Sequence, residues 1–201
     1  MWMTAVLTTA GITGSFAQGI NNGAACGCPT PVSGRTLTTI ESVFDTNNDG
    51  NQDVPVATLT CDKLWRLNTK YYVGNGQVLI VQPGTVVQAE ANTGTGTSAE
   101  AIIVSRGGKI FAEGSESCPI IFTIEGDDLD GTISGQANNF PQTLWGGIVL
   151  LGKAKNNLNT NCGPLVVAKG VGLIEGYATA EPRAYYGANL TGATIAGSPF
   201  S

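Results

Sequence analysis

Short β-branched runs separated by glycine turns form the hydrophobic pattern from Val78 onward. "IVQPGTVV" (80–87) aligns with "VSRGGKIF" (104–111) at an offset of 24 residues, which places Gly84 on Gly108. No stretch spaces its apolar residues as an amphipathic helix with flanking caps does. Repeating strands with glycine corners predict an all-β fold, a right-handed parallel β-helix (β-solenoid) with a coil of about 24 residues. The alternative is a β-sandwich whose strands are similar by coincidence.

A third copy of the strand fits if a polar loop is inserted before it. "IVLLGKA" (148–154) matches "VSRGGKI" at an offset of 44 residues, which places Gly152 on Gly108. The extra residues fit the polar, glycine-rich stretch 125–144, which predicts a loop leaving the coil. We therefore expect the β-helix over 60–176, its ladders between Tyr71 and Ile174, and Gly84, Gly108 and Gly152 at equivalent corners. The residues expected to stack inside are Leu79, Val81, Ile103, Ile110, Phe122, Val149 and Val166, with Trp65 and Trp145 in the core or at corners.

The repeat also relates two cysteines. Cys118 and Cys162 each follow one of the aligned glycines by ten residues, so they are expected at the same point of neighbouring coils. Stacked coils lie about 4.8 Å apart, within the separation that a disulfide tolerates, so this register predicts a Cys118–Cys162 disulfide. Cys61 pairs with Cys26 or Cys28 in the same scheme, and that choice stays open.

The chain begins with an apolar stretch of small residues that predicts a signal peptide over 1–17 and export to the cell surface or the extracellular space. The stretch is too short for a membrane span, and no later segment predicts one. The remainder divides into an N-terminal segment, 18–59, the β-helix, and a C-terminal tail or cap, 177–201.

"DTNNDGNQD" (45–53) spaces oxygen-bearing side chains two residues apart around Gly50, as calcium loops do. The twelfth position of a helix–loop–helix site would be Val56, so the loop is expected to hold a structural Ca²⁺ of modest affinity with water completing the shell. The expected ligands are Asp45, Asn47, Asp49, Asn51 and Asp53. The alternative is an Asx-rich turn without an ion.

The amino-acid composition excludes some partners and some catalytic groups. The net charge is −5, and ten scattered Lys and Arg residues argue against nucleic acid as a partner. The chain has no histidine, which removes the commonest general base. Asp127, Asp128 and Asp130 offer paired carboxylates, but a solvated or cation-binding turn is the preferred interpretation.

Five sequence blocks resemble, in their order along the chain, those of a family of exported bacterial surface proteins. The blocks are "VLIVQPGTVV", "IIVSRGGKIFAEG", "PIIFT", "WGGIVLLGKA" and "GLIEGY…YYG". The resemblance covers about 60–189 and implies a right-handed parallel β-helix and an extracytoplasmic address. It implies no activity. The chain resembles a short or truncated member without a sorting domain. Pectin-degrading β-helix enzymes use a histidine or an arginine base beside calcium, and neither context is present around Arg35, Arg66, Arg106 or Arg183.

These observations predict a non-catalytic surface or matrix protein, structural or adhesive, and no enzyme. The alternative is a polysaccharide-binding or pectin-lyase-like polysaccharide-degrading protein. Five tyrosines could supply a glycan-binding row: Tyr71, Tyr72, Tyr177, Tyr185 and Tyr186. The expected partners are a second copy meeting a solenoid end near Leu165–Ile174, unless the tail after Tyr177 covers that end, or surface glycans.

Overall fold

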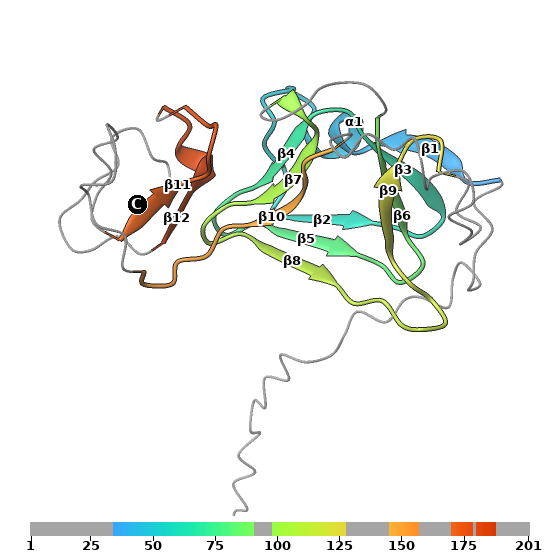
Figure 1. The fold of residues 1–201 in the computed structure, drawn as a ribbon. Helices are drawn as coiled ribbons and strands as arrows, with labels where there is room; N and C mark the ends of the chain where they lie inside the picture. The colour runs from blue at the N-terminus through green and yellow to red at the C-terminus, as the bar shows by residue number, and fades with distance from the viewer. Residues whose placement is uncertain (1–33, 91–97, 128–144, 157–169, 179, 188–201) are drawn as a thin grey trace, which may run out of the picture.

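A computed structural model describes residues 34–90, 98–127, 145–156, 170–178 and 180–187 of the chain. They form short strands, one α-helix and one 3₁₀ turn (Figure 1). In chain order these are β1 (Thr36–Thr39), α1 (Ile40–Phe44), β2 (Val56–Leu59), β3 (Lys63–Leu67), β4 (Lys70–Val73), β5 (Val78–Val81), β6 (Val86–Ala89), β7 (Ala101–Val104), β8 (Lys109–Ala112), β9 (Ile121–Ile124), β10 (Gly147–Leu150), β11 (Val171–Leu173), η3 (Pro182–Ala184) and β12 (Tyr185–Gly187). No helix of this described part is long and apolar enough to cross a membrane.

Three parallel sheets carry the fold. Their strand orders are β1-β3-β6-β9, β2-β5-β8 and β4-β7-β10. The chain visits the three sheets in turn, so β2, β3 and β4 make one coil, β5, β6 and β7 the next, and β8, β9 and β10 the third (Figure 1). This is a parallel β-helix, and the predicted fold class is confirmed.

The coil period differs from the predicted 24 residues. A coil spans 22 residues from Val56 to Val78 and 31 from Val78 to Lys109. Ile80 pairs with Phe111 and not with Val104, because the aligned sequence units belong to different sheets. Corners of unequal length cause this. The corner between β3 and β4 consists of residues 68 and 69 only. The corner between β6 and β7 is much longer and comprises residues 90 to 100.

The predicted equivalence of the three glycines is therefore corrected. Gly84 lies at the corner between β5 and β6, whereas Gly108 follows β7 and Gly152 follows β10. The pairing of Val104 with Leu150 also sets Gly108 and Gly152 two residues out of register. The predicted loop, 125–144, falls between the end of β9 at Ile124 and the start of β10 at Gly147, and residues 128–144 lie outside the described part.

The core runs along the axis of the coils. Leu79, Val81 and Trp65 are buried in it, with Ile110, Phe122 and Trp145 packed against it, as the sequence predicted. Two expected core residues lie elsewhere: Ile103 and Val149 belong to a second cluster, on the other face of β4-β7-β10. The cause is the side-chain alternation of strands, which places Tyr71 and Ile102 inside instead. Val166 lies outside the described residues.

Helix α1 covers the N-terminal end of the core. Ile40 is fully buried, and the ring of Phe44 stacks on Trp65 with centroids 5.7 Å apart. The Oε1 atom of Glu41 accepts hydrogen bonds from the backbone N–H groups of Asn68 and Thr69, at 2.8 and 2.9 Å. The helix is thereby tied to the first coil and closes it.

The parallel ladders of the described residues extend from Thr36 to Leu150, earlier at both ends than the predicted Tyr71 to Ile174. Beyond Leu150 the strand pairing changes direction. β11 pairs with β12 in antiparallel fashion, Val171 opposite Gly187. Part of the expected tail, 180–187, therefore returns to the body of the protein.

Candidate functional site

A cleft of about 520 Å³ lies where the C-terminal segment meets the loop after α1 and the start of β4. Its wall combines charged, aromatic and backbone groups from three parts of the chain. The lining residues are Asn48, Asp49, Gly50, Thr69, Lys70, Tyr72, Gly176, Tyr177, Ala178, Glu181 and Arg183.

The C-terminal segment is held against the β4-β7-β10 sheet by apolar packing and hydrogen bonds. Tyr177 and Tyr186 pack against the cluster that contains Ile103. The hydroxyl of Ser105 donates to the carbonyl of Arg183 at 2.9 Å, and the N–H of Gly187 donates to the carbonyl of Gly152 at 2.8 Å. These contacts hold the wall of the cleft that the C-terminal segment forms against the β-helix.

Arg183 joins the two walls. Its guanidinium lies 3.9 Å from the centroid of the Tyr72 ring, and Nη1 donates to the Asp49 carbonyl at 3.0 Å and to Oδ1 of Asn51 at 3.1 Å. Its Nε and Nη2 donate to the two oxygens of Glu181 at 2.6 and 2.7 Å. The hydrogen bond from Arg183 lowers the pKa of Glu181, and the same bond raises the pKa of Arg183.

Two phenols and a lysine complete the cleft. Burial raises the pKa of both Tyr72 and Tyr177. The Nζ atom of Lys70 lies 6.0 Å from the centroid of the Tyr177 ring. Tyr72 is buried and covered by Arg183, whereas Tyr177 is half-buried and lines the cleft.

The predicted calcium loop forms the N-terminal side of this cleft. Asp45 is fully buried, and its two oxygens accept from the N–H groups of Asp49 and Gly50 at 3.1 and 2.9 Å. Oδ1 of Asp49 accepts from the N–H of Asn51 at 2.7 Å. The hydrogen bond from the Asn51 backbone lowers the pKa of Asp49.

The other two predicted ligands also serve the turn. Oδ1 of Asn47 accepts from the N–H of Asp49 at 3.1 Å, and Oδ2 of Asp53 accepts from the N–H of Thr46 at 2.7 Å. Within the described residues no three His, Cys, Asp or Glu side chains gather as metal ligands do. In this arrangement the loop is closed by its own N–H groups and by Arg183.

The predicted disulfide is described at one end only. Cys118 is buried at the corner before β9, and Cys61 is buried at the corresponding corner before β3. Both are disulfide-bonded in the structure. Cys162 lies outside the described residues, as do Cys26 and Cys28, so the Cys118–Cys162 pair stays a prediction.

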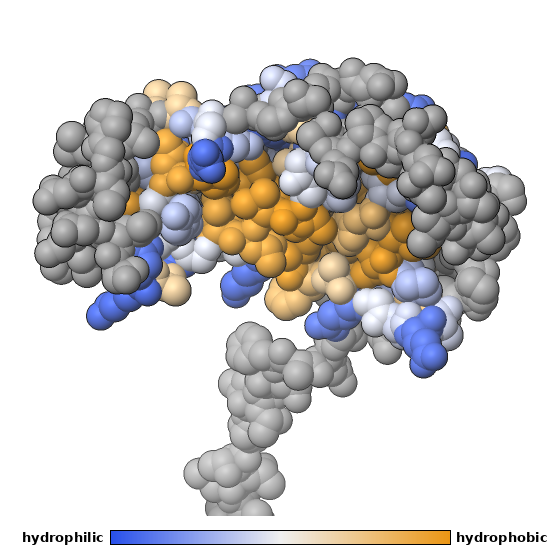
Figure 2. All heavy atoms as spheres, in the orientation of Figure 1, coloured by the Kyte–Doolittle hydropathy of each residue, from blue (hydrophilic) through white to orange (hydrophobic). Residues whose placement is uncertain are grey.

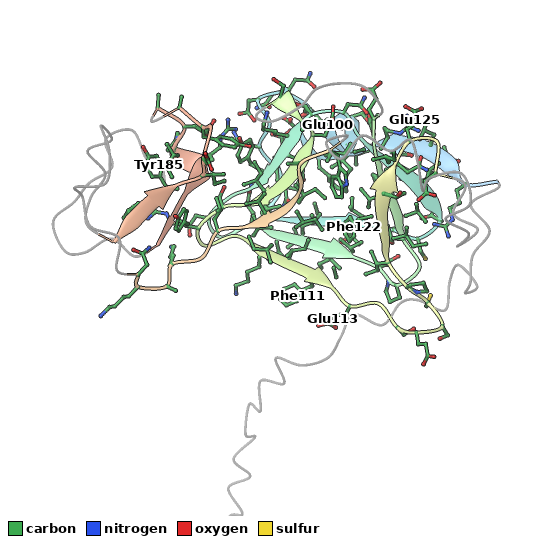
Figure 3. The ribbon with its side chains drawn as sticks, in the orientation of Figure 1. Glu100, Phe111, Glu113, Phe122, Glu125 and Tyr185 are labelled. Carbon is green, nitrogen blue, oxygen red and sulfur yellow. The ribbon has the colours of Figure 1, made fainter. Side chains whose placement is uncertain are left out.

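The other residues singled out in the sequence lie apart from the cleft. Asp127 accepts a hydrogen bond from the hydroxyl of Thr123 just after β9, and Asp128 and Asp130 lie outside the described residues. Tyr71 and Tyr185 are buried, so the tyrosines do not form one exposed row (Tyr185 is labelled on β12 in Figure 3).

The sequence analysis did not identify Lys70 or Glu181 as candidate site residues, and it did not assign Arg183 to any site. The only local signal is "EPR" (181–183). A Glu N-cap whose side chain accepts from the N–H of Arg183, followed by Pro182, begins the 3₁₀ turn that aims the guanidinium.

Comparison with known proteins agrees with the ladders. The model of the pectate-lyase-like β-helix domain matches residues 50–172, more than half of the chain. No curated protein and no solved structure matches. The matched range includes all three coils from β2 to β10, and the chain belongs to the family of pectate-lyase-like β-helix domains.

Proposed function

We propose that this β-helix is a non-catalytic, exported surface or matrix module that adheres by binding a polysaccharide in the cleft between Lys70, Tyr177 and Glu181. The observation that carries the proposal is the cleft itself, about 520 Å³ in volume and placed between a rigid coil and the returning C-terminal segment. The family relationship to pectate-lyase-like domains supports a saccharide as the ligand class.

The groups of the cleft match a hydroxyl-rich ligand. Sugar hydroxyls both donate and accept, so they need acceptors and donors side by side. Asp49 and Glu181 supply carboxylate acceptors, Lys70 supplies a donor, and the half-buried ring of Tyr177 supplies an apolar face with a polar tip.

The pKa pattern supports binding over catalysis. The pKa values of Asp49 and Glu181 are lowered, and those of Tyr72 and Tyr177 are raised. All four groups are thereby moved away from the neutral range in which a general acid or base works best. The second hypothesis is that the protein degrades a polysaccharide, and the match to the pectate-lyase-like β-helix domain favours this alternative.

Calcium, the disulfide and export belong to the same proposal. A structural Ca²⁺ held by Asp45, Asn47, Asp49, Asn51 and Asp53 would fasten the loop wall of the cleft, next to the hydrogen bonds that Arg183 makes to the Asp49 carbonyl and to Oδ1 of Asn51. The Cys118–Cys162 disulfide would join two coils of an exported protein. Peptide mapping without reduction tests that pair, and recovery of either cysteine as a free thiol would refute it.

The experiment is a binding survey of the 201-residue chain on immobilised polysaccharides, both uronic acid polymers and neutral ones, with a turnover assay on the polymers that bind. We expect retention without release of shorter products. Tyr177→Ala should abolish retention, whereas Tyr186→Ala, an aromatic of the same segment outside this cleft, should not. Retention by neither class of polymer would refute the binding, and reproducible turnover would establish the second hypothesis.

A further inference from the structure

The third coil ends in an open apolar face. Leu150 on β10 is 66% exposed, whereas the residues paired beneath it, Val104 and Val73, are 5% and 0% exposed. Ile148 is 36% exposed above a fully buried Ile102. Figure 2 shows the apolar side chains gathered between β8, β9 and β10. No described residue stacks on this face as each coil stacks on the one before, and contiguous exposed apolar patches mark interaction sites.

β8 is an edge strand at this face. It ends the order β2-β5-β8, and the N–H of Lys109 donates back to the carbonyl of Gln77 at 3.0 Å. Successive residues of a strand direct their backbone groups to alternate sides, so Ile110 and Ala112 direct theirs away from β5. No described strand pairs with β8 on that side. Such an edge is a template for another strand.

The outward side chains of β8 and the residue after it form a symmetric charge pattern. Lys109, Phe111 and Glu113 are spaced two residues apart, so their side chains lie on the same face of the strand. All three are exposed, Phe111 by 45%. Figure 3 shows Phe111 and Glu113 together at the lower edge of the molecule. Opposite charges thus stand two residues to either side of a central phenylalanine.

We propose that the open face is an interface with a second copy of this chain, joined end to end by antiparallel pairing of β8 with β8 about a two-fold axis at Phe111. This register pairs the free backbone groups of Ile110 with those of Ala112 in the other copy. It sets Phe111 opposite Phe111 and Lys109 opposite Glu113, twice by symmetry. The exposed side chains of Ile148 and Leu150 then face an apolar surface instead of water.

The charge pattern and the closed N-terminal end favour this occupant. Parallel stacking of one copy's third coil on another's first coil would have to displace α1, which covers that end through Ile40 and Phe44. The two-fold arrangement leaves α1 in place and is closed at two copies, so it forms no filament.

The test is a charge-swap experiment on the full chain, with molar mass measured by light scattering after size exclusion and folding checked by circular dichroism. The wild type is expected to be a dimer. Lys109→Glu and Glu113→Lys should each weaken the dimer by at least about tenfold, because each sets like charges opposite each other twice. An equimolar mixture of the two variants should recover a heterodimer, because both contacts are then attractive again. The double variant Lys109→Glu/Glu113→Lys should also dimerise.

The matched control is Val56→Lys on β2, the opposite edge strand, where Val56 is 52% exposed. It should leave the mass unchanged. A wild-type monomer at the highest soluble concentration would overturn the proposal. So would a dimer that the single charge variants leave intact, or a mixture that stays monomeric.

Discussion

The guanidinium of Arg183 lies 3.9 Å above the centroid of the Tyr72 ring, although 111 positions separate the two residues in the chain. Tyr72 belongs to the first coil and Arg183 to the returning C-terminal segment. The contact thus ties the C-terminal segment to the first coil at the wall of the cleft.

Removing this cation should detach the segment. Arg183→Ala loses the hydrogen bonds to Asp49 and Asn51 and leaves Glu181 without its ion pair, so we expect a loss of about 1–3 kcal/mol in the free energy of unfolding. Urea denaturation measures it. Arg183→Lys should recover only part of the loss, because lysine lacks the planar fork that stacks and bonds at once. A stability of Arg183→Ala equal to that of the wild type would contradict the fastening role.

The corner after β7 should be intolerant of a side chain. A Cβ on Gly108 would meet the carbonyl oxygen of Val73, which belongs to the rigid coil below. Gly108→Ala is therefore expected to cost about 1–3 kcal/mol. Gly152→Ala is the control, because the nearest atom to its Cβ would be the Ala154 nitrogen at 3.8 Å. Equal melting temperatures for the two variants would show that the corner yields without cost.

The buried acids predict a pH dependence. Burial raises the pKa of Glu41 and of Glu100 above the usual 4.5. At a pH between 4.5 and the raised pKa, the folded protein still holds protons on these carboxyl groups that the unfolded chain has lost. The free energy of unfolding therefore falls as the pH rises through that range. Glu181 and Asp49, with lowered pKa values, lose their stabilising charge only below about 4.5 and 3.8, the usual values.

We therefore expect the melting temperature to rise as the pH is lowered from neutral toward 4.5. The double variant Glu41→Gln/Glu100→Gln should show a smaller rise, since it has no carboxylate to protonate at these positions. Thermal melts in buffers of constant ionic strength measure both. A wild-type melting temperature that falls steadily over this range would contradict the assignment.

Strands β5, β7, β9 and β10 were predictable from sequence because each is a short run rich in β-branched residues, and the fold class followed from the repetition of such runs. The register was not, because "VSRGGKIF" and "IVQPGTVV" are both strand–corner–strand units, and nothing local says to which sheet a strand belongs. Asp45, Asp49 and Asp53 predicted a calcium loop, and the ion stays a prediction. The arrival of Arg183 at that loop depends on a contact 134 residues away in the chain, which no local pattern carries.

Calcium should act through the same loop. If the ion binds, a chelator should lower the melting temperature, and Asp49→Ala should abolish that sensitivity while the β-helix stays folded. Asp62→Ala, which removes an exposed carboxylate outside the loop, should keep that sensitivity. Equal melting temperatures in chelator and in excess calcium would leave an Asx-rich turn held by Arg183.

The most direct test of the account is a calorimetric titration of the 201-residue chain with an oligogalacturonide and with a neutral oligosaccharide of the same length. We predict saturable binding of at least one of the two, at least about tenfold weaker binding in Tyr177→Ala and in Lys70→Ala, and unchanged binding in Tyr186→Ala. Binding that all three variants leave unchanged would place the saccharide elsewhere, and no binding of either ligand would contradict the proposed function.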